Sequence, residues 1–395
     1  MELEIIMRTR TLVAMFSVSS ALLACSSSSG TGANGAAGDG GPTTGPLACE
    51  GATLVALPED PSARGPWAVG AKTVTVAGLT TEIWYPAAAG SDRGKATATY
   101  DLREHLPSAD KGKIPDSDNP LQACDCVRDL PLDVDHGPYP IIVFVHGTAG
   151  FRTQSLTFMT HWASRGFVVV AADHPGITLG DILGAGGGGK SPDQPGDARR
   201  LVAAMAAPSG DAAFLASHVD PKRVALAGHS AGGNAIGSLG DIPGVRVIIP
   251  MAAKGANAAA SLKSTLVLGA QSDNIALYSR VQDGYAASAP RKRFVGLSNA
   301  GHLAFSDLCA VGKDKGGLLQ IATAHGVTVN PLIATLSRDG CGATQLAPER
   351  GWAIVNYATS AVLEEELACS STAAARVATI ATAVPNVAEY REELK

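Results

Sequence analysis

The sequence predicts an α/β protein with a mostly parallel central sheet flanked by helices. From Cys49 onward, short apolar runs alternate with longer segments of helical character, which is the pattern of successive βαβ units. The run YPIIVFVHG at 139–147 is apolar almost without interruption, as expected of a strand buried on both faces. The chain has 395 residues, of which 46% are hydrophobic, 17% are charged and 45 are glycine, a composition typical of a globular protein rich in small residues.

Individual elements can be placed in order along the chain. KTVTV (72–76) and TTEIWYP (80–86) predict an antiparallel pair that precedes the parallel strands. Further strands are predicted within 139–147, 167–173 and 223–230, and three units in which a strand runs into a loop are predicted at 245–253, 264–273 and 292–302. Helices are predicted at 155–166, 197–207 and 351–368. Residues 308–347 form an irregular insertion with helical patches. We therefore expect a single domain over 49–395 that contains this insertion.

The first 48 residues predict an export signal and a tether. Two arginines precede an apolar stretch from Thr11 to Ala24, which is too short to span a membrane and has the form of a secretory signal over 1–24. Its end, LLAC, resembles the lipobox of bacterial lipoproteins, in which cleavage leaves the cysteine, here Cys25, as the lipidated first residue. The Ser/Gly-rich run over 25–48 cannot bury enough apolar surface to order itself. We expect an exported lipoprotein anchored to a bacterial membrane, periplasmic or at the cell surface, with plain secretion as the alternative.

Charge and cysteine content restrict the partners. The net charge of -5 and the absence of a long basic run argue against nucleic acid binding. Besides Cys25 there are six cysteines, an even number that favours disulfides in an oxidising compartment. Sequence does not choose among their pairings, but Cys309 with Cys341 is favoured because both flank one segment after His302. A metal site built from Cys124, Cys126 and His136 lacks further ligands at suitable spacing. We expect a monomer without metal or cofactor.

A nucleophile elbow is predicted at Gly228-His229-Ser230-Ala231-Gly232. This G-x-S-x-G pentapeptide lies where a strand turns sharply into a helix, the context that such an elbow requires. The turn exposes the serine at the end of the strand, and the positions two before and two after it pack too closely for larger side chains. Gly228 and Gly232 satisfy that restriction.

An acid and a histidine follow the serine in the order that this kind of site requires. Asp273 comes just after one predicted strand, and His302 lies in the loop after the next. All three side chains should meet at the carboxyl edge of the sheet, where open α/β sheets place their sites. His302 would then take the proton of Ser230 while Asp273 fixes its tautomer. Asp241 is the nearest alternative acid, but it comes too early in the chain.

A site for the oxyanion is also predicted. The backbone N–H of Ala231 is one donor, and the loop VHGTAG after the strand at 139–147 supplies the other, which we assign to Thr148. His146 is expected to shape that loop rather than to react. His229, His161 and His218 are interpreted as packing or surface residues.

A competing nucleotide-binding interpretation comes from LGAGGGGKSPD (183–193). Gly184, Gly189, Lys190 and Ser191 match the phosphate-binding loop pattern. The context differs, because HPGITLGDIL separates the loop from the preceding strand, and Pro192 and Pro195 follow where a helix should propagate. We therefore interpret the segment as a loop at the same sheet edge as Ser230.

Five stretches, taken in order, carry a resemblance to a known superfamily: GPWAVGAKTVTVAGLTTEIWYPA, IIVFVHGTAG, VVVAADHPG, VALAGHSAGG and NAGHLAFSD. They resemble the α/β-hydrolase superfamily and, within it, the branch of platelet-activating-factor acetylhydrolases, dienelactone-hydrolase-like proteins and cutinase-like polyester hydrolases. The resemblance spans about residues 65 to 310 and implies ester hydrolysis through an acyl-enzyme without metal or organic cofactor, on a small-molecule, lipid or polymer ester. Dienelactone hydrolases use a cysteine nucleophile, so that activity is disfavoured for a chain with Ser230. The segment from Cys309 to Cys341, which could act as a lid, resembles the superfamily least. The alternative is a non-catalytic lipoprotein that uses the fold to bind a ligand.

Overall fold

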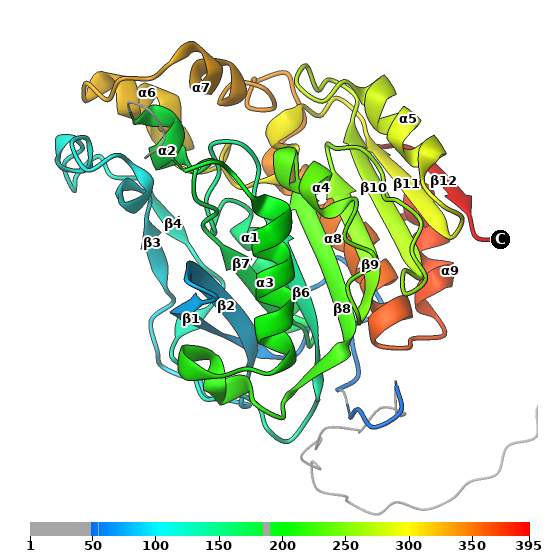
Figure 1. Cartoon of the computed structure of the whole chain (residues 1–395). Helices are drawn as coiled ribbons and strands as arrows, with labels where there is room; N and C mark the ends of the chain where they lie inside the picture. The colour runs from blue at the N-terminus through cyan, green and yellow to red at the C-terminus, as the bar shows by residue number, and fades with distance from the viewer. Residues whose placement is uncertain (1–48, 54, 185–189) are drawn as a thin grey trace, which may run out of the picture. The chain divides into compact units, whose positions relative to one another are not determined.

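The computed structural model describes residues 49–53, 55–184 and 190–395 (Figure 1). The predicted signal peptide (1–24), the tether (25–48) with Cys25, and residues 185–189 of the Gly-rich loop lie outside the described residues. Within the described ranges, no helix is both long enough and apolar enough to cross a membrane.

A large mixed sheet organises the described residues. Across it, the strands are β12 (Val387–Glu393), β11 (Lys292–Leu297), β10 (Ser264–Ala270), β9 (Val245–Met251), β8 (Val219–His229), β6 (Tyr139–Val145), β7 (Val168–Ala172), β2 (Leu79–Ala87), β1 (Ala68–Val76) and β5 (Val127–Arg128). From β11 to β7 all neighbours are parallel. The predicted pair β1 and β2 is antiparallel, and β2 also pairs antiparallel with β7. The prediction of a mostly parallel sheet with an antiparallel pair ahead of it is confirmed.

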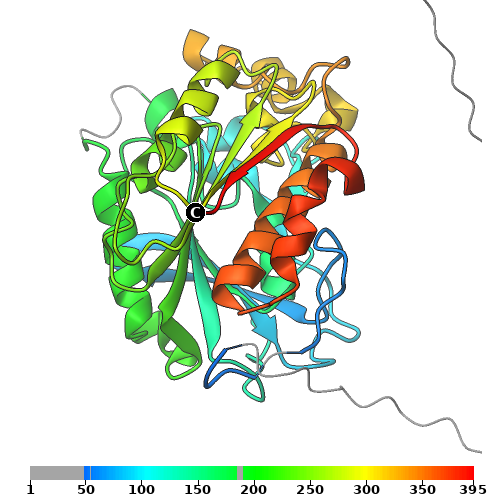
Figure 2. The same ribbon diagram turned by 90° about the vertical axis from the view of Figure 1, so that its right-hand side faces the viewer.

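Helices cover both faces of this sheet. They are α1 (Leu156–Ser164), α2 (Leu179–Leu183), α3 (Gln194–Ala206), α4 (Ala231–Ile236), α5 (Tyr278–Ala287), α6 (Leu318–Ala324), α7 (Pro331–Leu336), α8 (Pro348–Leu367), α9 (Ala373–Ala378) and α10 (Ile380–Ala383). α3, α4 and α5 pack on one face, and α1 and α8 pack on the other. Figure 2 shows the orange and red helices α8 and α9 on one side of the strands and the green helix α3 on the other.

The core explains why β6 is apolar throughout. Every residue of β6 is buried. Ile142 and Phe144 join an apolar cluster that includes residues of α1 and α8. Ile141, Val143 and Val145, which alternate with them, join a second cluster that includes residues of α3. Because successive side chains of a strand point to opposite faces, a strand covered on both faces must be apolar at every position.

Several elements differ from the sequence prediction. The helix predicted at 197–207 begins earlier, at Gln194, and Pro195 lies in its first turn. Proline is tolerated there because the first N–H groups of a helix have no partner within the helix. Pro195 is therefore no argument against a helix after Ser191. The short helix α2, which separates β7 from the Gly-rich loop, was not predicted, and it replaces the direct strand-to-loop connection of a phosphate-binding loop.

Short strands were missed by the sequence pattern. β5, the edge strand β12 and the small sheet of β3 (Thr99–Asp101) and β4 (Leu121–Ala123) were not predicted. β12 is polar and only half-buried to exposed, so it lacks the apolar alternation that marks a strand.

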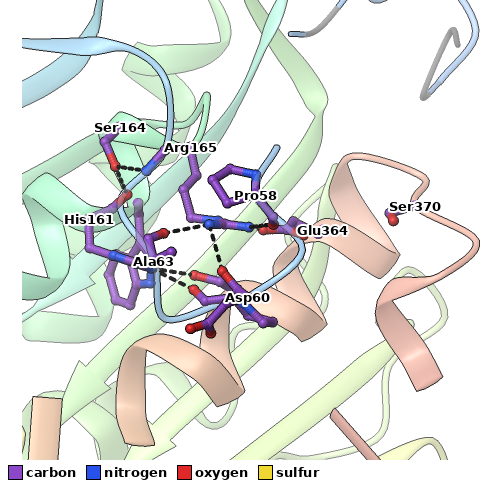
Figure 3. A network of polar contacts seen from close by, with 12 residues as sticks. Pro58, Asp60, Ala63, His161, Ser164, Arg165, Glu364 and Ser370 are labelled. Atoms are coloured by element: carbon purple, nitrogen blue, oxygen red, sulfur yellow. Dashed lines mark hydrogen bonds and ion pairs between the residues drawn. The ribbon is translucent and has the colours of Figure 1, made fainter. Parts of the chain in front are cut away.

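The start of the described chain is anchored to the domain by a buried arginine (Figure 3). The Arg165 side chain is fully buried and donates to Glu364 of α8 at 2.6 Å. Its remaining N–H groups donate to the carbonyl oxygens of Pro58, Asp60 and Ala63. A disulfide between Cys49 and Cys369 adds a covalent link. Removing one partner of such a buried pair leaves an uncompensated charge and costs roughly 3 to 5 kcal/mol.

Residues 309–341, here called the cover segment, make up most of the stretch that was predicted as an insertion (308–347). They contain a short 3₁₀ turn, α6 and α7, and a disulfide joins Cys309 to Cys341, the pair favoured from the sequence. A further disulfide joins Cys124 to Cys126, so these two residues are not thiolate ligands of a metal. Among the described residues, no group of three or more histidine, cysteine or acidic side chains could hold a metal ion.

Candidate active site

The residues predicted to act together lie in loops at one edge of the sheet. Ser230 directly follows β8, Asp273 follows β10, and His302 follows β11. These strands are parallel, so their carboxyl ends meet at the same edge. The loop with Thr148 follows β6, the strand beside β8. The topology therefore gathers three further loops around the turn that carries Ser230.

Ser230 occupies a strained turn. Its φ of 55° and ψ of -118° are unusual for a residue with a side chain. A Cβ on Gly232 would lie 2.1 Å from the carbonyl oxygen of Val145, and one on Gly228 would lie 2.7 Å from the Gly232 backbone. Such contacts would push α4 away from β6 and from β8. The glycines thus let the turn pack against the sheet, as the sequence predicted, and strain of this kind concentrates at functional sites.

Asp273 and His302 form a buried pair. The Nδ1 atom of His302 lies 2.8 Å from Oδ2 of Asp273, and both side chains are almost fully buried. The other carboxylate oxygen, Oδ1, accepts from the backbone N–H groups of Ile275 and Ala276. With an ionised carboxylate, this contact assigns the proton to Nδ1 and leaves Nε2 of His302 as an acceptor.

Ser230 and His302 line the same cavity. Among the contacts of the described residues, no hydrogen bond joins the Ser230 hydroxyl to the His302 ring. Nucleophile and base are often farther apart without substrate and draw together in the substrate complex. The geometry therefore presents an oriented imidazole and a half-buried serine at one cavity, where a substrate could draw them together.

The predicted oxyanion donors face no competing acceptor. Thr148 lines the cavity, and Ala231 is the first residue of α4. Among the described residues, neither backbone N–H donates a hydrogen bond to another backbone group. Free N–H groups beside the nucleophile are what an oxyanion requires.

His229 makes specific hydrogen bonds in addition to packing in the core. Its Nε2 donates to the carbonyl oxygen of His302 at 3.0 Å, and its Nδ1 accepts from the Gln154 amide at 3.1 Å. Burial, reinforced by the neighbouring His302 ring, holds the pKa of His229 well below its usual value. A neutral ring fits this pattern of one donor and one acceptor. His229 thus connects the serine turn to the His302 loop. The only sign of this role in the sequence was its position next to Ser230.

The remaining predicted residues lie apart from this chemistry. His146 is buried, contacts the carbonyl oxygen of Gly147 and accepts from the N–H of His174, so it shapes the Thr148 loop as expected. His161 contacts the carbonyl oxygen of Pro61. Asp241, the alternative acid, is exposed and pairs with Arg199 at 2.9 Å.

A largely apolar cavity of about 830 Å³ opens onto Ser230. Its apolar lining comes from both the domain body and the cover segment, and it includes Leu102, Leu106, Ile114, Leu183, Leu318, Ile321, Ile333 and Leu336. Among the described residues, the charged side chains that line it are Arg103, Lys313 and Arg338, and no carboxylate lines it. The cavity is large enough for a small ligand with a long apolar part.

A comparison with known proteins gives a match that covers part of this site. No curated protein matches the chain significantly. Residues 130–240 match the chlorophyllase family, which belongs to the α/β-hydrolase superfamily. The matched stretch includes β6, the Thr148 loop, β8 and Ser230, whereas Asp273 and His302 lie beyond it. This similarity supports a hydrolase of the α/β-hydrolase type.

Proposed function

We propose that this protein is a serine hydrolase of carboxylic esters with an α/β-hydrolase fold, acting through an acyl-enzyme on Ser230. The observation that carries the proposal is the buried Asp273–His302 pair, which opens onto the same cavity as a serine held in a strained turn. A neutral serine hydroxyl needs an oriented base of this kind to become a nucleophile. The similarity of residues 130–240 to the chlorophyllase family supports the same reaction class.

The proposed reaction has two halves. The Ser230 oxygen attacks the ester carbonyl carbon while Nε2 of His302 accepts the hydroxyl proton, and Asp273 stabilises the resulting imidazolium. The oxyanion receives hydrogen bonds from the N–H groups of Thr148 and Ala231. His302 returns the proton to the departing alcohol, which leaves the acyl group on Ser230. Water, activated by the same histidine, then releases the acid.

The cavity favours a lipophilic ester. Its apolar lining matches an acyl or alcohol chain and gives a polar headgroup little to bind apart from Arg103, Lys313 and Arg338. The exposed side chains of Ile275 and Leu277, which follow Asp273, extend apolar surface beside the acid loop.

The test is active-site labelling combined with turnover. A fluorophosphonate probe should label the folded protein and fail to label Ser230→Ala. A series of p-nitrophenyl esters of increasing chain length should be hydrolysed by the wild type and not by the variant. A folded wild type that is neither labelled nor active on any ester would overturn the proposal in favour of a ligand-binding protein.

We further propose that the protein is exported and anchored through Cys25, with plain secretion as the alternative. The three disulfides among the described residues support an oxidising compartment. Metabolic labelling with a fatty acid should mark the wild type and not Cys25→Ser. A wild type that carries no label and is released in soluble form would favour secretion.

A further inference from the structure

Asp339, in the cover segment, contacts both the acid loop and the histidine loop. Its Oδ2 accepts from the N–H of Asn274 at 2.8 Å, and its Oδ1 accepts from the N–H of His302 at 2.9 Å. Its backbone carbonyl accepts from the N–H of Leu303 at 2.8 Å. One residue from outside the sheet thus holds the backbone directly beside Asp273 and at His302.

The surroundings of Asp339 are built for this contact. Its side chain is buried, with a relative exposure of 7%. A Cβ on Gly301 would lie 2.4 Å from its Oδ1, and a Cβ on Gly340 would lie 2.9 Å from the N atom of Leu303. Gly340 also has a φ of 108°, which favours glycine. The two glycines therefore allow the carboxylate and the histidine loop to approach.

Asp339 lies two residues before Cys341, within the segment whose side chains line the cavity. We propose that Asp339 is a positioning residue for ester hydrolysis. By accepting hydrogen bonds from both loops, it keeps the Asp273 carboxylate and the His302 ring in the relative position that their contact requires. The cover segment then does more than line the cavity, because its placement sets the geometry of the acid and the base. This inference rests on the proposed function.

Substitution has a defined chemical consequence. In Asp339→Asn only one oxygen remains, so one of the two backbone N–H groups faces an amide donor instead of an acceptor. The loss of a hydrogen bond to a charged acceptor predicts a fall in kcat of roughly 10- to 100-fold. KM should change little, because Asp339 is not among the residues that line the cavity. Asp339→Glu keeps the charge but displaces the carboxylate, and it should lower kcat in the same way.

The experiment compares kinetics and labelling in four proteins: the wild type, Asp339→Asn, Asp339→Glu and the control Asp314→Asn. Asp314 is an exposed carboxylate of the same cover segment, outside the cavity lining. Both Asp339 variants should lose kcat and fluorophosphonate labelling rate by similar factors, while the control keeps both. Thermal unfolding shows whether each variant is folded. If Asp339→Asn does not fold, Asp339→Glu replaces it in the comparison.

A double-mutant cycle with Asp273→Asn separates positioning from a general structural effect. If Asp339 acts through the Asp273–His302 pair, its substitution should lower kcat by a much smaller factor when Asp273 is already replaced. An equal loss in both backgrounds, or Asp339 variants as active as the control, would overturn the inference while the enzyme itself remains. An unlabelled, inactive wild type would instead overturn the proposed function, and this inference with it.

Discussion

The serine turn and the cover segment are held in place by different kinds of contact. At the turn, backbone packs against backbone: Gly228 and Gly232 let α4 approach β8 and β6 so closely that a methyl group has no space. In the cover segment, a disulfide, the carboxylate of Asp339 and apolar side chains around the cavity provide the attachment. The turn depends on neighbours in the sequence and sheet, whereas the cover segment depends on contacts across long stretches of chain.

This difference predicts how each region responds to change. Changes at the loops proposed to be catalytic, those that carry Ser230, Asp273 and His302, should remove activity and leave the fold intact, because the sheet supports them. Changes in the cover segment should alter substrate selection and local stability more than the chemical step. The exception is Asp339, which connects the two regions.

The largest effect is expected at the catalytic edge. Asp273→Asn should lower kcat by roughly 10⁴-fold, because an amide can hold the wrong tautomer of His302. The melting temperature should change little, since the amide keeps a similar shape. Steady-state kinetics on a p-nitrophenyl ester, with thermal unfolding in parallel, provide the measurement.

Asp241→Asn is the matched control for that variant, because Asp241 is an exposed carboxylate paired with Arg199. It should keep wild-type kcat. Should Asp273→Asn retain kcat within tenfold of the wild type, Asp273 is not the residue that orients His302.

Removing the Cys309–Cys341 disulfide should have the next largest effect, and on the cover segment. The bridge closes a loop with a sequence separation of 32 residues, for which chain entropy predicts a contribution of roughly 3 to 4 kcal/mol. The double variant Cys309→Ser, Cys341→Ser should be cleaved faster by protease within 309–341 and should show a higher KM. Limited proteolysis with mass mapping locates the cleavage.

The bridge between Cys124 and Cys126 spans a separation of only two residues and serves as the control. Its removal should not change cleavage within 309–341. Equal protection of the cover segment with and without the Cys309–Cys341 bridge would show that its apolar contacts and Asp339 suffice.

The same contrast explains what the sequence could predict. The meeting of Ser230, Asp273 and His302 at one edge could be predicted because each follows a strongly apolar strand, and the order of parallel strands carries them there. Asp339 had no such signal. It lies in an irregular segment far from His302 in sequence, and only the folded chain brings its carboxylate to the N–H of His302. β12 was missed for a related reason, since pairing with β11 rather than its own pattern makes it a strand.

A smaller effect is expected at Asp307, which lies between His302 and the cover segment. Its Oδ2 accepts from the N–H of Thr157 and from Gln122, whereas Oδ1 is buried without a partner among the described residues. Burial raises the pKa of Asp307 from 3.8 to about 7. The unfolded chain therefore loses this proton at lower pH than the folded protein does. The stability that depends on Asp307 should be fully present below about pH 4 and should decline as pH rises toward 7.

Asp307→Asn removes this titration and keeps an acceptor for Thr157. At pH 8 the variant should be more stable than the wild type by roughly 4 kcal/mol, and the two should converge near pH 4. Urea unfolding at both pH values measures the difference. A constant difference across that range would show that Asp307 is not protonated on folding.

The smallest effect is expected at Ile333 of α7, where the cover segment contributes an apolar side chain to the cavity. Ile333→Ala creates space in the apolar wall of the cavity. Esters with longer chains should therefore be hydrolysed more efficiently relative to esters with short chains. The ratio of kcat/KM between long and short esters should rise roughly 3- to 10-fold, the discrimination expected from a few methylene groups. kcat on the shortest ester should stay near the wild-type value, because the catalytic loops are untouched.

Leu332→Ala is the control, since Leu332 is the adjacent residue of α7, is 49% exposed and does not line the cavity. It should leave the chain-length profile unchanged. Two ester series sharpen the result: acyl chains on a p-nitrophenyl leaving group, and acetates of increasing alcohol length. The series that responds to Ile333→Ala identifies which part of the ester lies beneath the cover segment, and a response in neither would exclude this wall of the cavity from substrate binding.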